Sequence, residues 1–183
     1  GVSGADLANV INEAAILATR TGRTAINNRD LDEAVLRVVA GPERKSRILN
    51  DEERQVIAFH EVGHALVTKF LCRSEEVHKV SIVSRGQALG VTVQSPIEDR
   101  YLLTRSQLLA RMAAILGGRA AEEITFGEVT TGAQQDLERV SGIARRMVCE
   151  LGMGGLGNVT FGRREDVGLL GQVSETTATR IDE

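Results

Sequence analysis

The spacing of apolar residues predicts a chain built mainly of helices. Apolar positions that recur three and four residues apart are typical of one buried helix face. This spacing runs through residues 4–21, 28–40, 51–71, 105–127 and 131–151, and residues 174–183 read as the start of another helix. The residues predicted to face inward are Leu7, Val10, Ile11, Ala14, Leu17, Leu31, Ala34, Val35, Val38, Leu108, Met112, Ile115, Leu116, Leu137, Val140, Ala144, Met147 and Leu151.

Polar residues and glycines indicate where these helices begin and end. Ser3 with Asp6, and Thr104 with Gln107, have the spacing of a capping box at a helix start. Gly22 is expected to end the first helix. The pair Gly41-Pro42 is a strong break. We therefore expect a boundary here, between a small helical piece and the main domain.

Two short segments rich in β-branched residues, 78–83 and 89–94, predict strands with glycines nearby. They form either an ordinary structural hairpin or an edge strand to which an extended peptide pairs through its backbone. Residues 151–162 are rich in glycine and predict a loop. The expected fold class is mainly α, of the α+β kind, with a small β element.

Composition narrows the classes of function. The content of 42% hydrophobic and 26% charged residues is that of a globular protein. A net charge of −3 and only 3% aromatic residues argue against a nucleic-acid partner. Cys72 and Cys149 form no CxxC pair and read as buried reduced thiols. No apolar run is long enough to cross a bilayer, and because the chain opens in a helix without Met, we expect a piece of a longer protein.

Residues 60–64 read HEVGH and contain two of the three histidines of the chain. Four residues along a helix return to nearly the same face, so His60 and His64 can present both imidazoles to one metal ion. Glu61 is rotated by about 100° from His60, which is a suitable place for a general base that takes a proton from attacking water. Gly63 is interpreted as leaving room beside the metal. The competing interpretation is a coincidental pair of structural histidines.

A catalytic zinc ion needs a third protein ligand. His78 lies in a predicted strand. If that strand lies away from the site, His78 is a structural residue or a residue that faces the substrate. Glu122 and Glu123 end one predicted helix, and Asp136 lies in the first turns of the next, beside apolar Leu137. A carboxylate at the edge of a buried face needs a partner, which zinc would supply. Spacing alone does not separate Asp136 from Glu122 or Glu123.

Five segments, in order along the chain, resemble the FtsH family of membrane-anchored, ATP-dependent AAA+ zinc metalloproteases. They read GVSGADLANVINEAA, FHEVGHAL, HKVSIVSRGQALGVT, LGGRAAEEITFG and TTGAQQDL. Such a series is far more specific than HExxH alone. The first segment is similar to a helix of the AAA+ lid subdomain and the second to the zinc helix, and the resemblance covers essentially the whole chain.

The resemblance implies roles for individual residues. His60, His64 and Asp136 match the family's ligands of one Zn²⁺ per chain, and Glu61 matches its catalytic glutamate. These four residues are therefore expected to carry the reaction.

Four further positions match the family with lesser roles. Glu122 or Glu123 is implied to support the zinc site without binding the metal. Gly4 and Ala5 match lid positions that lie near the nucleotide only in the full-length parent. Because the sequence contains no GxxxxGK[ST] phosphate-binding loop, ATP and Mg²⁺ are expected only in that parent, and no cofactor-binding residue for them is expected here.

The resemblance also implies two domains: the C-terminal part of an AAA+ lid at 1–41, with two helices, and a zinc metallopeptidase domain at 42–183, truncated at its C-terminus. The implied function is an ATP-dependent metalloendopeptidase that degrades unfolded membrane and soluble proteins, of which this chain carries the proteolytic part. The parent is implied to be a homo-hexamer. It is expected on the cytoplasmic side of the bacterial inner membrane, or its organelle equivalent, attached through a segment absent from this soluble piece.

Two other functions compete with this interpretation. The first is a zinc-stabilised assembly module without turnover, but Glu61 is intact and a closed structural site normally carries a fourth protein ligand. The second is a zinc hydrolase of small amides, and the lid-like residues 1–40 favour the feeding of polypeptides instead.

Overall fold

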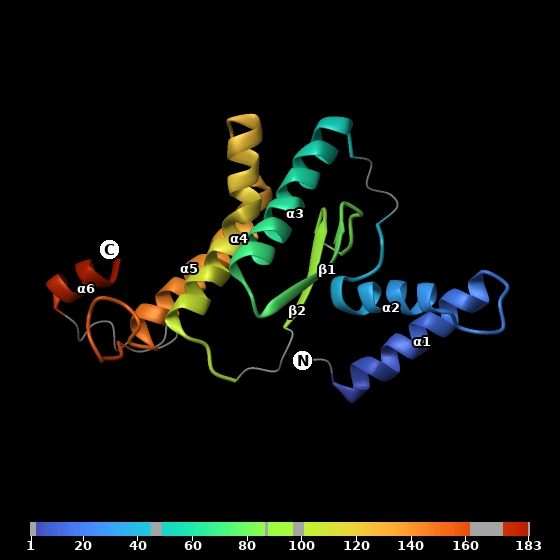
Figure 1. The fold of residues 1–183 in the computed structure, drawn as a ribbon, viewed down its shortest axis with the longest axis horizontal. Coiled ribbons are helices and arrows are strands. Elements are labelled where there is room, and N and C mark those ends of the chain that lie inside the picture. The colour runs from blue at the N-terminus through green and yellow to red at the C-terminus, as the bar shows by residue number, and fades with distance from the viewer. Residues whose placement is uncertain (1–2, 45–48, 87, 97–100, 162–173, 183) are drawn as a thin grey trace.

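The computed structural model describes residues 3–44, 49–86, 88–96, 101–161 and 174–182. The prediction of a mainly helical chain with a small β element is confirmed (Figure 1). No helix in the described ranges is long and apolar enough to cross a membrane. The elements in chain order are α1 (Gly4–Arg20), α2 (Asn28–Ala40), α3 (Asp51–Leu71), β1 (Glu75–Ser81), β2 (Val91–Pro96), α4 (Arg105–Phe126), the 3₁₀ turn η1 (Thr131–Ala133), α5 (Gln134–Cys149) and α6 (Glu175–Asp182).

Helices α1 and α2 form an antiparallel pair at one end of the molecule (Figure 1). Ser3 with Asp6 forms the predicted capping box, and Asn27 with Asp30 forms another that starts α2. Arg23 donates two hydrogen bonds of 2.6 Å to the Asp30 carboxylate, which together with the Asn27 N–H lowers the pKa of Asp30 to about 2. The connection between the two helices is therefore tied back onto the start of α2.

The small core of this pair holds only part of the predicted inward face. Buried Val10, Ala14 and Ala34 form the cluster, with Leu17, Leu31 and Val38 packed against it. The prediction was wrong for Leu7, Ile11 and Val35, which are exposed. Two helices cover only a narrow stripe of each other, so apolar residues at the margin of the stripe remain open to solvent.

Helix α3 packs along α4 through two glycines whose backbones touch. A Cβ on Gly63 would overlap the Gly117 carbonyl and lie 2.7 Å from the Ala121 Cβ. The interpretation of Gly63 as space beside the metal was therefore wrong, because the space is filled by the backbone of α4. This close approach brings the side chains and carbonyls of α4 within reach of the HEVGH segment.

Strands β1 and β2 form a two-stranded antiparallel hairpin beside α3 (Figure 1). Both strands are displaced from their predicted bounds: β1 begins three residues earlier and ends at Ser81, and β2 begins at Val91. The pairing shifts between Val77 and Lys79, so His78 is the extra residue of a bulge. Hydrophobic runs show that strands exist, but the pairing of the two backbones decides where each begins.

The second half of the chain follows the predicted order of helices. Thr104 and Gln107 form the predicted capping box of α4, and Gly127, in a left-handed conformation, ends it. Predicted inward residues Leu108, Ile115 and Met147 are buried. Leu137 and Leu151 are exposed, so those two predictions were wrong. The predicted loop 151–162 is confirmed over 151–161, and residue 162 lies outside the described residues.

The glycine contact between α3 and α4 gives a stability prediction. We expect Gly63→Ala to destabilise the chain by about 1–3 kcal/mol, because the added methyl group meets a backbone carbonyl that no rotamer change can move aside. The gain in helix propensity, about 0.5–1 kcal/mol, opposes this cost without cancelling it. Urea unfolding monitored by circular dichroism measures the difference.

Gly142→Ala is the matched control for this experiment. Gly142 lies inside α5, and a Cβ there meets no atom within 4 Å. This variant should be stabilised by about 0.5–1 kcal/mol. Equal stabilisation by both substitutions would contradict the tight contact of α3 with α4.

Candidate metal centre

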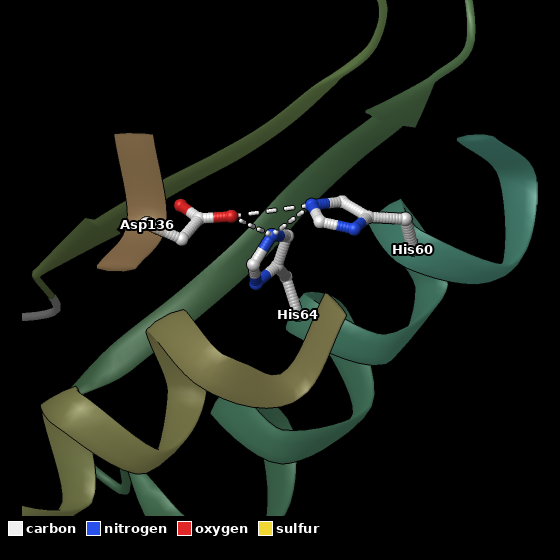
Figure 2. A group of neighbouring side chains, drawn as sticks. All are labelled: His60, His64 and Asp136. Atoms are coloured by element: carbon white, nitrogen blue, oxygen red, sulfur yellow. Dashed lines mark hydrogen bonds and ion pairs between the residues drawn. The ribbon is translucent and has the colours of Figure 1, made fainter. Parts of the chain in front are cut away.

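Two turns of α3 hold the two histidines of the HEVGH segment side by side (Figure 2). The ring centroids of His60 and His64 are 4.6 Å apart and the planes are nearly perpendicular, at 85°. Their Nε2 atoms lie 2.9 Å from each other. The helical spacing of four residues therefore points both nitrogens to one place.

Asp136 approaches the same place from the first turn of α5. Its Oδ2 atom lies 3.2 Å from the Nε2 atom of His60 and 3.2 Å from that of His64 (Figure 2). A tetrahedral zinc ion with bonds of 2.0–2.1 Å separates its ligand atoms by about 3.3 Å. The three atoms thus form a triangle of the size that one face of a zinc coordination sphere requires.

The other nitrogen of each imidazole is held by α4. Nδ1 of His64 donates to the Ala114 carbonyl at 2.9 Å, and Nδ1 of His60 lies 2.6 Å from Oε1 of Glu122. A carbonyl can only accept, so the proton of neutral His64 is on Nδ1, and its Nε2 presents a lone pair. The Glu122 carboxylate favours the same tautomer of His60. Two nitrogen lone pairs and a carboxylate oxygen of Asp136 then converge, which only a cation or an added proton can satisfy.

Glu122 is 1% exposed and both of its oxygens have partners. Oε1 faces His60, and Oε2 accepts a hydrogen bond of 2.7 Å from the Thr130 N–H. This carboxylate consequently connects α4, the zinc helix α3 and the start of η1. Glu123, the neighbouring candidate, is exposed and is outside this network.

The charges around the cluster favour a cation. Burial alone lowers the pKa of His60, but hydrogen bonds with Asp136 and Glu122 outweigh it and raise the pKa above its ordinary value. Burial alone raises the pKa of Asp136, but hydrogen bonds with His60 and His64 reverse this and hold it well below its usual range. An ionised carboxylate with two imidazoles is a donor set that fits Zn²⁺.

Glu61 lies beside this triangle and does not belong to it. The Oε2 atom of Glu61 accepts a hydrogen bond of 2.7 Å from the hydroxyl of Thr92 on β2, and the side chain is 8% exposed. A Cβ on Gly90 would lie 2.7 Å from Oε1. The carboxylate is therefore confined between α3 and the start of β2. Glu61 and all three ligand candidates line one cavity of about 750 Å³.

Several residues that shape the site were missed by sequence reasoning. A Cβ on Gly118 would lie 2.6 Å from the His60 ring, so only glycine admits the imidazole there. Gly90 and Thr92 confine Glu61, and no periodicity or motif singled them out. Spacing favoured Asp136 only through its neighbour Leu137, which is exposed. The turn η1, capped by Thr130, directly precedes the first turn of α5, which carries Asp136.

The remaining candidates lie elsewhere. His78 is exposed on the bulge of β1, with Nε2 2.6 Å from the Ser95 hydroxyl. Gly4 and Ala5 begin α1, and neither lines the cavity. The structure therefore brings together His60, His64 and Asp136, places Glu61 and Glu122 next to them, and leaves Glu123, His78, Gly4 and Ala5 apart.

The HExxH helix α3 supplies two imidazoles and a glutamate, and α5 supplies a carboxylate. This set of groups is typical of the class of zinc-dependent hydrolases. A model of peptidase family M41 matches residues 47–183, and a model of the AAA+ lid domain matches residues 1–33. The chain belongs to peptidase family M41. The predicted resemblance to FtsH-type proteases is thereby confirmed at the level of the family, whereas the boundary between residues 41 and 42 stays a prediction.

Curated relatives match the whole length of this chain. The chain is 52% identical to ATP-dependent zinc metalloprotease FtsH 1 of Conexibacter woesei, and 50% and 49% identical to ATP-dependent zinc metalloproteases FtsH of Pseudothermotoga lettingae and Thermotoga maritima. All of this chain is covered in each comparison, but only 28%, 31% and 32% of the respective relatives. The chain thus spans about a third of the length of these relatives.

The different environments of the three carboxylates give a prediction for zinc binding. Asp136→Asn should weaken zinc binding most, because it removes the only anionic atom of the triangle. Glu122→Gln should weaken it by roughly 10–100-fold, the usual cost of losing a partner behind a metal ligand. Its amide can accept from His60, but then its NH₂ group faces the Thr130 N–H. Competition titration with a chromophoric chelator measures the zinc dissociation constants of the parent and of both variants.

Glu123→Gln is the control, since Glu123 is adjacent in sequence and exposed. Its zinc affinity should equal that of the parent. Full zinc binding by Asp136→Asn, with loss of zinc by Glu123→Gln, would reverse the assignment.

Proposed function

We propose that this chain is the proteolytic part of an ATP-dependent zinc metalloendopeptidase. The observation that carries the proposal is the arrangement of Glu61 beside the triangle of His60, His64 and Asp136 in one cavity. Membership of a peptidase family and the names of the relatives support it. The chain covers only part of those relatives, so the activity of the whole protein is itself part of the proposal.

Each residue of the site has a separate task in peptide hydrolysis. His60, His64 and Asp136 hold the metal, and Lewis-acid catalysis on a peptide carbonyl is the chemistry that a bound Zn²⁺ would supply. Glu61 takes the proton of the attacking water and transfers it to the leaving amine. Thr92 donates to one oxygen of Glu61, which fixes the carboxylate. Glu122 fixes the ring of His60 through Nδ1.

The surroundings of the site favour an extended polypeptide as substrate. Val91, Thr92 and Gln94 of β2 line the cavity, and within the described residues the sheet has only two strands. One edge of β2 therefore lacks a strand partner and offers backbone groups to an extended peptide. Recognition through the backbone depends little on side chains, which suits cleavage of many unfolded proteins.

The parent protein is proposed to be a homo-hexamer attached to the cytoplasmic side of the bacterial inner membrane, or its organelle equivalent. Its ATPase ring would pass unfolded membrane and soluble proteins to this site. The match of residues 1–33 to an AAA+ lid domain supports this arrangement. A zinc-stabilised assembly module without turnover is the alternative, and the buried, restrained carboxylate of Glu61 argues against it because such a module needs no base.

Glu61→Gln separates catalysis from metal binding. The substitution keeps the size of the side chain and removes its basicity, so zinc should stay bound while hydrolysis of casein or a fluorogenic peptide falls by roughly 10²–10⁴-fold. His60→Ala and His64→Ala should instead lose zinc and activity together. Metal analysis beside the cleavage assay provides both quantities. An active Glu61→Gln protein with normal zinc would refute the proposed mechanism.

The effect of ATP on cleavage is a second test of the proposed function. The sequence contains no phosphate-binding loop, so ATP with Mg²⁺ should leave cleavage by this 183-residue chain unchanged, and the chain alone should hexamerise weakly or not at all. Cleavage rates with and without ATP, together with sedimentation velocity, measure these two properties. Stimulation by ATP would show a nucleotide site that the sequence does not predict.

A further inference from the structure

Arg85, in the turn between β1 and β2, is a buried cation that reaches across to α2. The side chain is only about 5% exposed. Its Nη2 atom donates to both oxygens of Glu33, at 2.8 and 3.1 Å, and Nη1 lies 3.5 Å from the Gly41 carbonyl. We call this ion pair the Glu33–Arg85 clamp. It joins the lid-like helix α2 to the hairpin of the peptidase part.

Backbone hydrogen bonds reinforce the clamp. The Gly86 N–H donates to the Pro42 carbonyl at 3.3 Å, and the Arg44 N–H donates to the Ser84 carbonyl at 2.9 Å. These bonds accompany an antiparallel bridge between Glu43 and Arg85. The segment that leaves α2 is thus paired with the turn that carries Arg85, so the two cannot move independently without breaking hydrogen bonds.

The same turn leads directly to the residues that confine Glu61. Arg85 and Ala88 exchange two backbone hydrogen bonds, of 3.0 and 2.8 Å, and the Ser84 hydroxyl donates to the Leu89 carbonyl at 3.3 Å. Gly90 follows at once and abuts the carboxylate of Glu61. Two residues later, Thr92 donates to that carboxylate. Arg85 is therefore joined to the surroundings of Glu61 by a hydrogen-bonded turn.

The Glu33–Arg85 clamp is better suited to orienting α2 against the hairpin than to stabilising the folded chain. The ion pair adds little net stability, because Arg85 loses its hydration while Glu33 stays 30% exposed. Within the described part of the chain, the Nε atom of Arg85 has no hydrogen-bond partner, which adds a further cost. The guanidinium nevertheless has a defined orientation, because Nη2 binds Glu33 while Nη1 points to the Gly41 carbonyl. Burial alone raises the pKa of Glu33, but Arg85 and Arg37 lower it below its ordinary value, so the pair stays charged at neutral pH.

We propose that Arg85 is a positioning residue for Glu61, and that the Glu33–Arg85 clamp couples the orientation of α2 to the place of the catalytic carboxylate. This inference rests on the proposed role of Glu61 as the general base. The rings of the ligands His60 and His64 are held by hydrogen bonds to α4, not by the hairpin. Movement of the lid would accordingly change the rate of hydrolysis without changing metal binding.

Glu33→Gln in the zinc-loaded chain tests the coupling. The variant removes the charge opposite Arg85 and keeps the size of the side chain. We expect kcat for a fluorogenic peptide to fall roughly tenfold, below the 10²-fold cost of a 1 Å misplacement, with KM and zinc content unchanged. Hydrogen exchange of the amides of residues 88–92 should become faster. Hydrogen exchange measures the coupling between α2 and residues 88–92 even where peptide turnover is slow.

Asp30→Asn is the matched control, because Asp30 also lies on α2 and pairs with an arginine, Arg23, that stays within the lid. It should speed exchange in α1 and α2 only, and leave kcat at the parent value. Arg85→Gln, which removes the guanidinium charge, tests the same link from the other side. Combined with Glu33→Gln, it should lower kcat no further than Glu33→Gln alone, because both substitutions break the Glu33–Arg85 ion pair.

The outcomes separate this inference from the proposed function. A Glu33→Gln protein with parental kcat and parental exchange at residues 88–92 overturns the clamp, and so does loss of zinc in that variant. Additive losses in the double variant overturn it as well. Failure of the proposed function would be seen elsewhere, as undiminished cleavage by zinc-loaded Glu61→Gln, whatever Glu33→Gln does.

Discussion

The whole site depends on how closely α3 and α4 approach each other. Gly63 and Gly117 allow the two backbones to touch. At that separation the Ala114 carbonyl and the Glu122 carboxylate of α4 reach the Nδ1 atoms of His64 and His60. Because those bonds set both tautomers, the direction of the two nitrogen lone pairs follows from the packing of α3 on α4.

Carboxylates close to one another acquire different chemistry from their surroundings. Asp136 presents an oxygen to two imidazoles, and this contact keeps it ionised. Glu122 has both oxygens engaged in hydrogen bonds and is inaccessible, which suits orientation of a ring. Glu61 keeps one oxygen restrained by Thr92 and faces the cavity, which suits proton transfer. One functional group, the carboxylate, thus occupies three different environments: beside two imidazoles, buried behind an imidazole, and facing the cavity.

The hairpin connects these elements to the rest of the chain. On one side β2 restrains Glu61, and on the other the turn holds Arg85 against Glu33 of α2. Glu61, the cavity wall formed by β2 and the lid-like helix α2 are therefore all in contact with one small sheet. A two-stranded sheet has little stability of its own, so its geometry depends on the helices that it contacts.

The sequence by itself determined the local features. Helix α3 has its predicted bounds, and the predicted capping boxes of α1 and α4 are present, because capping and apolar periodicity act within a few residues. The spacing of His60 and His64 is equally local. Spacing alone left Asp136, Glu122 and Glu123 unresolved, and only the resemblance to the family pointed to Asp136. Sequence reasoning also misplaced the strand ends and misread Gly63. The tertiary structure decided the strand ends and Gly63, and it placed Asp136 beside the histidines, since each depends on which backbone lies opposite.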